Sequence, residues 1–454
     1  MTVDTNIING KIFTPEGFLE GGISIERDRI IKVGKEPSLS KASNRIDAKG
    51  ALILPGLIDI HVHFRDLEQE NKETMITGTR SAIAGGITSV LDMPNNKPPT
   101  NTAQRVKNKK QIIEGKAAAN IGFYSLLPEN TKEIKPLFLE GIFGFKIYPA
   151  SPIYPPKDNQ KLLSILKSQS EYKIPLIVHL DNGYADESEK MLLEKNIPVI
   201  DAFLKSHNQI EEAKALKDFI ELSKTSKNSL HCSHVTAKKT VELIEKNQDN
   251  NNLSSEICVH HLFLTANDLR KMGSQAKCLP PVRTHVDQTA LWEALNSGLI
   301  NIIATDHAPH SYKEKHCEFE SAASGIHGLE TMLPLMFTAA AKGQTSFEKI
   351  IPALTVNPAQ LMDINYRGEL KQGYYADVVV VEKKKRKIIA ENFESKAKWT
   401  PFDGREVLFT PKYVLVNGLL SKDEDFIITK ANAGKILERK YDVKLQDEMN
   451  EDEE

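Results

Sequence analysis

Residues 57–66, LIDIHVHFRD, form an apolar run that carries two histidines two positions apart, His61 and His63. In a β-strand, residues i and i+2 point to the same face, so both imidazoles can reach one metal ion. A Pro-Gly pair precedes the run, and a Gly-Gly pair follows it one helix length later. A buried strand with two hydrogen-bonded histidines explains this segment equally well, so the rest of the chain must decide between the two interpretations.

The composition is that of a folded globular protein. The chain has 454 residues, of which 40% are hydrophobic and 26% charged, enough for a large core. Its formal net charge of −2 gives no electrostatic reason to bind nucleic acid or an anionic membrane. The sequence contains no membrane-spanning apolar run and no signal-peptide pattern at its start. The scattered cysteines form no CxxC pair, so we expect free thiols in a cytoplasmic protein.

Strand patterns occur near both ends of the chain and flank a long middle part. Alternating apolar and polar residues appear at 6–13 and 22–27, and again at 375–381 and 413–418. We therefore expect a small β-sandwich domain built from both termini. The predicted regions are 1–53 and 363–430 for this domain, 54–362 for the middle part and 431–454 for a polar acidic tail, disordered from about residue 445.

The middle part repeats a strand followed by a helix, which predicts an α/β fold, specifically a (β/α)8 barrel of the TIM type. Helical patterns lie between the strands, for instance at 158–172, 211–224 and 237–247. An open doubly wound sheet is the alternative, but no GxGxxG follows the first strand. The eight candidate strands are 57–63, 87–93, 120–127, 142–148, 175–180, 229–235, 256–264 and 300–306.

Ionisable residues stand near the ends of several of these strands. Lys146 lies near the end of the fourth, His179 closes the fifth, His234 closes the sixth and Asp306 closes the eighth. In a barrel the carboxyl ends of the strands converge on one mouth, where active sites are built. Each residue alone is readily explained as structural, but together with the first strand they predict a shared metal site.

The residue types limit the chemistry of that site. His61, His63 and an Asp306 oxygen suit one divalent ion of the zinc class, and His179 and His234 suit a second. Two neighbouring cations need a bridging anion, which a protonated Lys146 cannot supply. Burial lowers the pKa of a lysine, and the neutral amine can react with CO2 to form a carbamate that spans both ions.

Such a centre favours hydrolysis of an amide-like bond. Metal ions acidify water and polarise a carbonyl group. Asp306 could accept the proton of the attacking water and deliver it to the leaving nitrogen.

Several motifs resemble the amidohydrolase superfamily and, within it, the dihydroorotases of the longer bacterial class. HVHFRD at 61–66 is similar to the start of the first sequence signature of that family. KET at 72–74, AGGIT at 84–88 and MPN at 93–95 continue the same signature. ATDHAPH at 304–310 resembles the second signature of the family. The match continues at GI 325–326, GLET 328–331, TVNPA 355–359 and PFDG 401–404. The resemblance covers about residues 50–420.

The resemblance implies an enzyme that interconverts N-carbamoyl-L-aspartate and L-dihydroorotate in pyrimidine biosynthesis, with one or two zinc ions per chain. By position, it implies a carboxylated Lys146 bridging the ions and a substrate carboxylate held by Arg65, Asn95 and His310. A planar guanidinium beside the metals can grip a carboxylate with two hydrogen bonds, which supports the role of Arg65. A homodimer and an association with another pyrimidine-pathway enzyme both stay open. The implied metal ligands are His61, His63, Lys146, His179, His234 and Asp306.

Some positions depart from the family pattern. Leu279 stands where the family commonly has an asparagine that contacts the substrate, and Cys278 before it also occurs in allantoinase-like relatives. Allantoinase and hydantoinase activities therefore stay open, as does a non-catalytic scaffold of the same fold. We expect His231 and His261 on strands near the mouth, as core histidines or as residues that orient a ligand. The segment 311–324 is expected to be a mobile flap or an ordinary surface loop.

Overall fold

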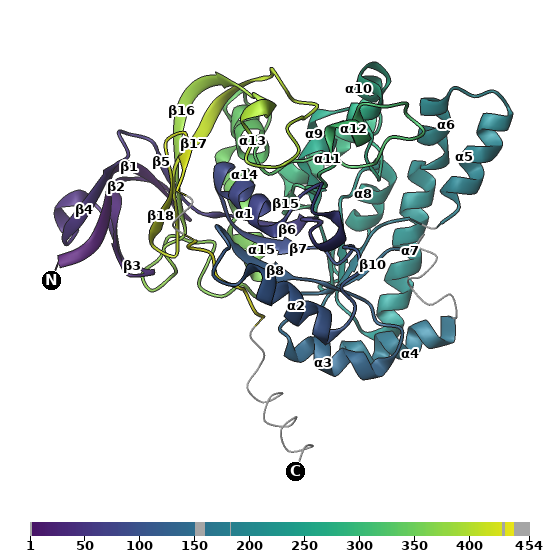
Figure 1. The fold of residues 1–454 in the computed structure, drawn as a ribbon, viewed down its shortest axis with the longest axis horizontal. Coiled ribbons are helices and arrows are strands. Elements are labelled where there is room, and N and C mark those ends of the chain that lie inside the picture. Colours follow the sequence, from purple (N-terminus) through teal and green to yellow (C-terminus); the bar gives the residue numbers. More distant parts are fainter. Residues whose placement is uncertain (1, 150–158, 182, 429–431, 440–454) are drawn as a thin grey trace, which may run out of the picture.

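The computed structural model describes residues 2–149, 159–181, 183–428 and 432–439. It has an α/β barrel and a twisted β-sheet domain beside it, which contains strands from both ends of the chain (Figure 1). The architecture predicted from the sequence is therefore present. The expected disorder from residue 445 lies outside the described residues.

Eight strand positions form the barrel, and the paired strands within it all run parallel. The first and last positions meet through Val62 and His307, which form a parallel bridge. This contact closes the ring and brings the ends of the first and eighth strands together. The barrel strands are β6 (Leu57–Val62), β7 (Ile87–Asp92), β8 (Asn120–Phe123) with β9 (Ser125–Leu126), β10 (Phe145–Ile147), β11 (Leu176–Val178), β12 (Leu230–Cys232), β13 (Leu253–Ser255) with β14 (Ile257–Cys258), and β15 (Ile303–Ala304).

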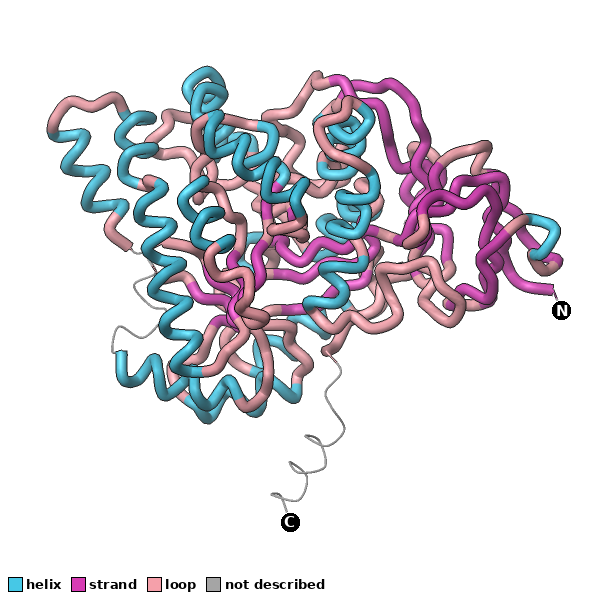
Figure 2. Tube along the Cα trace, turned by 180° about the vertical axis from the view of Figure 1, so that it is seen from behind, coloured by secondary structure: helices cyan, strands magenta, loops and turns pink. Residues whose placement is uncertain are grey.

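Helices surround the barrel strands (Figure 2). The first, α1 (Met75–Ala84), begins at Thr74, whose hydroxyl caps the amide of Thr77, and it ends before Gly86 at a φ of +84°. A Cβ at Gly78 would overlap the ring of Phe64, so this helix packs directly on the residue that follows His63. The helices that follow are α2 (Ala103–Ile113), α3 (Ile134–Leu139), α4 (Asn159–Ser170), α5 (Ala185–Glu194), α6 (Val199–Ser206), α7 (Gln209–Ser226), α8 (Lys238–Glu245), α9 (Val259–Phe263), α10 (Ala266–Met272), α11 (His285–Ser297), α12 (Tyr312–Lys315), α13 (Met332–Ala341), α14 (Phe347–Leu354) and α15 (Val356–Leu361).

The seventh predicted strand, 256–264, is wrong in its second half. The strand β14 ends at Cys258, and the next residues form the short helix α9. A short apolar run has the same composition in a buried strand and in a buried helix, so periodicity could not separate them. His261 therefore lies on a helix and not on a strand.

The sheet domain has nine strands in one hydrogen-bonded sheet. Its order is β19-β18-β17-β16-β5-β1-β2-β3, with β4 also paired to β1. The N-terminal strand β5 runs antiparallel to the C-terminal strand β16, with Leu54 opposite Val379. Because β5 leads directly into β6, this pairing fixes the sheet to the start of the barrel. The strands are β1 (Thr2–Thr14), β2 (Gly17–Glu26), β3 (Arg29–Gly34), β4 (Lys41–Asp47), β5 (Leu52–Pro55), β16 (Val378–Lys387), β17 (Glu406–Val416), β18 (Leu419–Asp423) and β19 (Phe426–Ile427).

Part of the segment that the sequence assigned to a polar tail packs on the barrel. Ile436 forms a parallel bridge with Ile121 of β8, and the Gly434 amide donates to the Ala117 carbonyl. Residues 432–439 therefore add a short extended segment beside β8.

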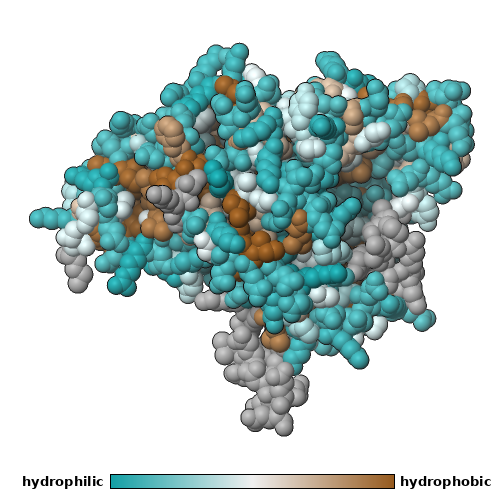
Figure 3. All heavy atoms as spheres, in the orientation of Figure 1, coloured by the Kyte–Doolittle hydropathy of each residue, from teal (hydrophilic) through white to brown (hydrophobic). Residues whose placement is uncertain are grey.

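The face shown in Figure 3 is mostly hydrophilic, with apolar patches over the sheet domain. Within the part of the chain that the structure describes, no helix combines the length and the apolar character needed to span a bilayer.

Candidate metal centre

Three predicted ligands from the first and eighth strands meet at one end of the barrel. His61 lies near the end of β6, His63 follows that strand, and Asp306 follows β15. The Asp306 Oδ1 lies 2.9 Å from His63 Nε2 and 3.4 Å from His61 Nε2. One ligand atom of each residue lies within 4.8 Å of the others, and all three side chains are buried. This trio can hold one metal ion.

The far nitrogens of the two histidines are anchored. His61 Nδ1 hydrogen-bonds to Glu256 Oε1, and His63 Nδ1 donates to Asn95 Oδ1 at 2.7 Å. An imidazole that donates through Nδ1 keeps its lone pair on Nε2, the nitrogen that faces Asp306 here. Asn95, predicted to hold substrate, is thus positioned to orient a ligand.

His179 and His234 form the second part of the centre. They follow β11 and β12, and His179 Nδ1 lies 2.8 Å from His234 Nε2. The ring centroids of His234 and His61 are 5.4 Å apart, so these two histidines adjoin the first trio. The buried Nδ1 of His234 has no hydrogen-bond partner among the described residues.

Lys146 is fully buried in β10. Its Nζ donates to Ser233 Oγ at 2.7 Å, and within the described residues no carboxylate lies within ion-pairing distance of it. Burial lowers the pKa of Lys146 to about 8, so a neutral amine forms readily near physiological pH. Lys146 is therefore not part of an ion pair within the described residues.

The charge states also suit metal binding. Burial lowers the pKa of His63 and of His179 to about 4, so both imidazoles are neutral at pH 7. Burial would raise the pKa of Asp306, but His61 and His63 hold it well below its usual range. Neutral imidazoles and an ionised carboxylate are the forms that bind divalent ions of the zinc class. The side chains present therefore fit one or two such ions.

The predicted substrate-binding residues Arg65 and His310 lie side by side at this mouth. Arg65 Nη2 is 3.1 Å from His310 Nε2, and its Nε donates to the Pro309 carbonyl. Lys72 Nζ lies 3.3 Å from His310 Nδ1 and 2.8 Å from Glu314 Oε1. Because Lys72 is paired with Glu314, Arg65 is the one of these two cations that has no ion-pair partner among the described residues and can bind an anion.

Three residues of the site were not predicted from the sequence. Glu256 bonds both His61 and His231, whose Nε2 is 3.1 Å from Glu256 Oε2. Ser233 accepts a hydrogen bond from the amine of Lys146, and Lys72 contacts His310. An acidic residue at the start of an otherwise apolar strand was the available signal for Glu256. Its two histidine partners depend on the closed barrel, which pattern alone does not show.

The segment 311–324 is held by two lysines. Lys315 Nζ donates to the carbonyls of Lys277 and Ala323, and Lys277 Nζ donates to the carbonyl of Phe319 at 2.7 Å. Its short helix α12 carries Glu314, the partner of Lys72. These hydrogen bonds fix the segment as an ordered loop next to His310.

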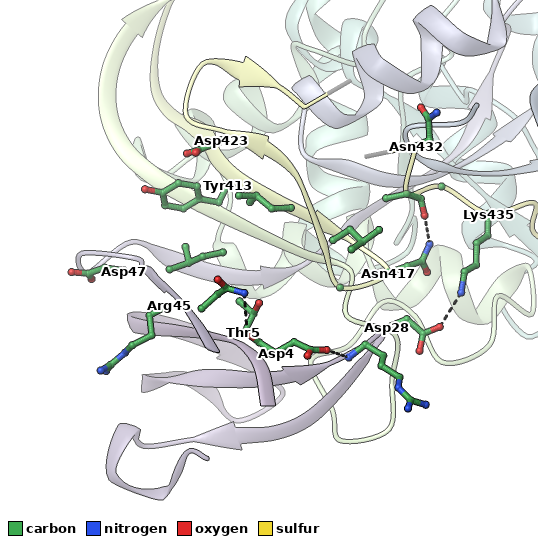
Figure 4. Close-up of a pocket in the computed structure, with 18 of the residues that line it drawn as sticks. Asp4, Thr5, Asp28, Arg45, Asp47, Tyr413, Asn417, Asp423, Asn432 and Lys435 are labelled. Carbon is green, nitrogen blue, oxygen red and sulfur yellow. Dashed lines mark hydrogen bonds and ion pairs between the residues drawn. The ribbon is translucent and has the colours of Figure 1, made fainter. Parts of the chain in front are cut away.

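A cavity of about 1230 Å³ opens elsewhere, between the N-terminal strands and the C-terminal segment (Figure 4). Some of its charged side chains are paired: Lys435 Nζ lies 2.9 Å from Asp28 Oδ2, and Asp4 accepts from the Arg27 amide. None of its lining residues belongs to the histidine cluster. This cavity is therefore separate from the candidate metal centre.

Comparison with known proteins identifies relatives of the whole chain. The chain is 32% identical to a dihydroorotase of Methanosarcina mazei, over 98% of this chain and all of that protein. It is 34% identical to a dihydroorotase of Pyrococcus horikoshii, over 96% of each chain. Among solved structures, the L-hydantoinase (dihydropyrimidinase) of Arthrobacter aurescens superimposes with a TM-score of 0.92 at 27% identity, covering 96% of this chain and all of that one.

Residues 52–420 match the amidohydrolase family. This region contains the barrel, the ligand cluster and most of the C-terminal strands. The chain belongs to the amidohydrolase family.

Proposed function

We propose that this chain is a dihydroorotase, which catalyses the reversible cyclisation of N-carbamoyl-L-aspartate to L-dihydroorotate. The observation that carries the assignment is the buried guanidinium of Arg65, two residues after His63 and in contact with His310. Dihydroorotate differs from neutral cyclic amides in its carboxylate, which such a fork can bind with two hydrogen bonds. The dihydroorotase relatives, 32–34% identical over most of the chain, support the same choice.

The proposal includes zinc, as one or two ions per chain. His61, His63 and Asp306 would hold one ion, and His179 and His234 the other. Carboxylated Lys146 would bridge them: its neutral amine attacks CO2, a nitrogen–carbon bond forms and one proton leaves. Bound zinc would supply an acidified water and a polarised substrate carbonyl.

The side chains of this protein would then bind the substrate and move its protons. Arg65 and His310 hold the carboxylate, which orients the scissile amide toward the ligand cluster. In the ring-opening direction, Asp306 takes a proton from the attacking water while the new carbon–oxygen bond forms. It returns that proton to the ring nitrogen as the carbon–nitrogen bond breaks, and cyclisation follows the reverse path.

A hydantoinase or allantoinase activity is the second candidate. The L-hydantoinase likeness and the Cys278-Leu279 pair favour it, because Leu279 cannot donate a hydrogen bond to a substrate. Leu279 lines a small cavity together with His179, so this difference lies beside the centre.

One assay separates the candidates. Purified protein is tested side by side with dihydroorotate, allantoin and dihydrouracil, before and after removal of metal by a chelator. We expect turnover of dihydroorotate alone, lost on metal removal and restored by zinc. Preferential turnover of allantoin or dihydrouracil would assign the second candidate instead, and full activity of metal-free protein would refute both.

A cytoplasmic role in pyrimidine biosynthesis belongs to this proposal. Whether the chain forms a homodimer or binds another enzyme of that pathway stays a prediction from the sequence.

A further inference from the structure

A second buried cluster of metal-ligand types lies outside the site described above. It consists of His260 and His261 on α9 and of Cys278, which precedes the Leu279-Pro280 pair. One ligand atom of each lies within 4.8 Å of the others, and the three side chains are only 1–2% exposed. Within the described ranges, only this group and the trio of His61, His63 and Asp306 meet that criterion.

The hydrogen bonds of the two imidazoles leave one nitrogen of each unused. His261 Nε2 donates to the Pro280 carbonyl at 3.0 Å, and His260 hydrogen-bonds to the backbone of Thr305. The buried His260 Nε2 and His261 Nδ1 have no partner in the described part of the chain. A neutral imidazole that donates through one nitrogen carries its lone pair on the other. Metal-binding histidines typically show this arrangement, with the second nitrogen fixed to a carbonyl or carboxylate.

The thiol completes a set of soft and borderline donors. Cys278 Sγ lies 3.3 Å from the Pro280 carbonyl oxygen, the same atom that accepts from His261. Burial raises the pKa of this thiol to about 12, so it is protonated without a metal ion. A bound cation removes that cost, because the thiolate is stabilised by the metal–sulfur bond.

We propose that His260, His261 and Cys278 form an additional site for a thiophilic divalent cation of the zinc class, separate from the catalytic centre. Binding replaces the sulfur–hydrogen bond by a sulfur–metal bond and releases one proton. Ligand atoms in a tetrahedral zinc site lie roughly 3.4–3.7 Å apart. Because the ligand atoms here lie within 4.8 Å of one another, the side chains need to draw together by no more than roughly 1.4 Å on binding. A fourth position is left for water or another small ligand.

Such an ion would have a structural role at the barrel mouth. It would tie α9, which follows the seventh strand, to the segment that carries Leu279 and Pro280. That segment lines a small cavity with His179 of the catalytic cluster. The additional ion would therefore hold one wall of the mouth in place, without touching the reacting atoms.

The test uses Co2+ as the probe on the whole protein. Metal-depleted protein is reconstituted with Co2+, and the bound metal per chain and the near-ultraviolet sulfur-to-cobalt charge-transfer band are measured. The wild-type protein should show the band. Cys278→Ser should lose the band and one metal equivalent per chain, and His261→Asn should also lose one equivalent while keeping the thiol.

Cys258→Ser is the matched control, because Cys258 is equally buried and directly precedes α9 but belongs to neither cluster. It should keep both the band and the metal content. The proposal is overturned if the wild-type protein shows no such band, or if Cys278→Ser and His261→Asn both bind as much Co2+ as the wild type. A band that is lost in Cys258→Ser but kept in Cys278→Ser would also overturn it. None of these readouts depends on which substrate the enzyme turns over.

Discussion

Two buried polar clusters in this protein differ in how completely their polar groups are hydrogen-bonded. At the junction of barrel and sheet, Arg367 donates to Asp377 and to Asn417, and Asp377 also accepts from Asn120. The Asn417 side chain in turn donates to Asn120 Oδ1 and to a backbone carbonyl. At the barrel mouth, by contrast, Lys146 lacks a counter-ion and His234 Nδ1 lacks a partner among the described residues.

Backbone conformation does not separate the two clusters. His234 and Asp306 at the mouth have φ values of +37° and +46°, and Asn417 at the junction has a φ of +49°, all in the left-handed region that costs energy for residues other than glycine. The hydrogen bonds do separate them, because a satisfied polar network stabilises a fold, whereas unpaired buried groups persist where function requires them. The comparison therefore predicts that substitutions at the mouth affect metal and activity, and that substitutions at the junction affect stability.

Lys146→Ala should give the largest effect and test the mouth directly. If Lys146 bridges the ions as proposed, its loss should remove metal, whose contribution of several kcal/mol corresponds to at least about 10³-fold in activity. Metal content, activity and circular dichroism are measured with and without acetate or propionate, which can replace the missing carboxylate. Lys109→Ala is the control, because Lys109 is equally buried but paired with Asp92, and it should keep its metal. Full activity of Lys146→Ala would exclude the carbamate.

Arg367→Met should have the opposite signature. Removing one partner of a buried ion pair leaves Asp377 as an uncompensated charge and costs about 3–5 kcal/mol of unfolding free energy. Denaturant unfolding measures this loss, while kcat/KM per folded molecule should stay unchanged. Lys385→Met, which removes an exposed ion pair with Glu406, should leave the unfolding midpoint in place. A loss of kcat/KM without a loss of stability would contradict a purely stabilising role of the junction cluster.

Arg65→Ala separates substrate binding from metal binding at the mouth. Hydrogen bonds to a charged group contribute about 1.5–3 kcal/mol, which corresponds to about 10–150-fold in kcat/KM for dihydroorotate. Metal content should not change, and Arg65→Lys should recover only part of the loss because it lacks the planar fork. If a neutral cyclic amide such as dihydrouracil is turned over, its kcat/KM should change little. Equal losses for both substrates would rule out the role assigned to Arg65.

Glu330→Gln tests a carboxyl group outside both clusters through the pH dependence of stability. Desolvation raises the pKa of Glu330 to about 8, although Ser81 and two backbone amides donate to its Oε1. Because the folded state holds this proton more tightly than the unfolded state, the wild type loses stability as pH rises from about 5 to about 8. Relative to the variant, the loss should be at most about 1 kcal/mol per pH unit, since the side chain keeps some exposure. The unfolding free energy of both proteins is measured as a function of pH. Parallel curves would contradict the raised pKa of Glu330.

Much of this organisation could be predicted from the sequence. Apolar runs between Gly and Pro residues located the barrel strands, and the spacing of His61 and His63 located the centre of the mouth. Asp306 could be placed beside them because parallel strands of a closed barrel end at one rim.

Other features depend on contacts that no local pattern encodes. The helix α9 has the composition of a buried strand, and Glu256 acts only because the barrel brings His61 and His231 to it. The contact of Asn95 with His63 likewise depends on the loop after β7 folding back over the mouth. The pairing of residues 432–439 with β8 joins segments more than 300 positions apart, which a polar composition did not reveal.

Anomalous scattering at the zinc absorption edge, from crystals of active protein grown without added metal, tests the central claim most directly. If His61, His63 and Asp306 bind zinc, an anomalous peak is expected at about 2.0–2.1 Å from His61 Nε2 and His63 Nε2, next to Asp306. Density extending from Lys146 Nζ toward that peak would mark the carbamate. Crystals of fully active protein with no anomalous peak among these residues would contradict the account.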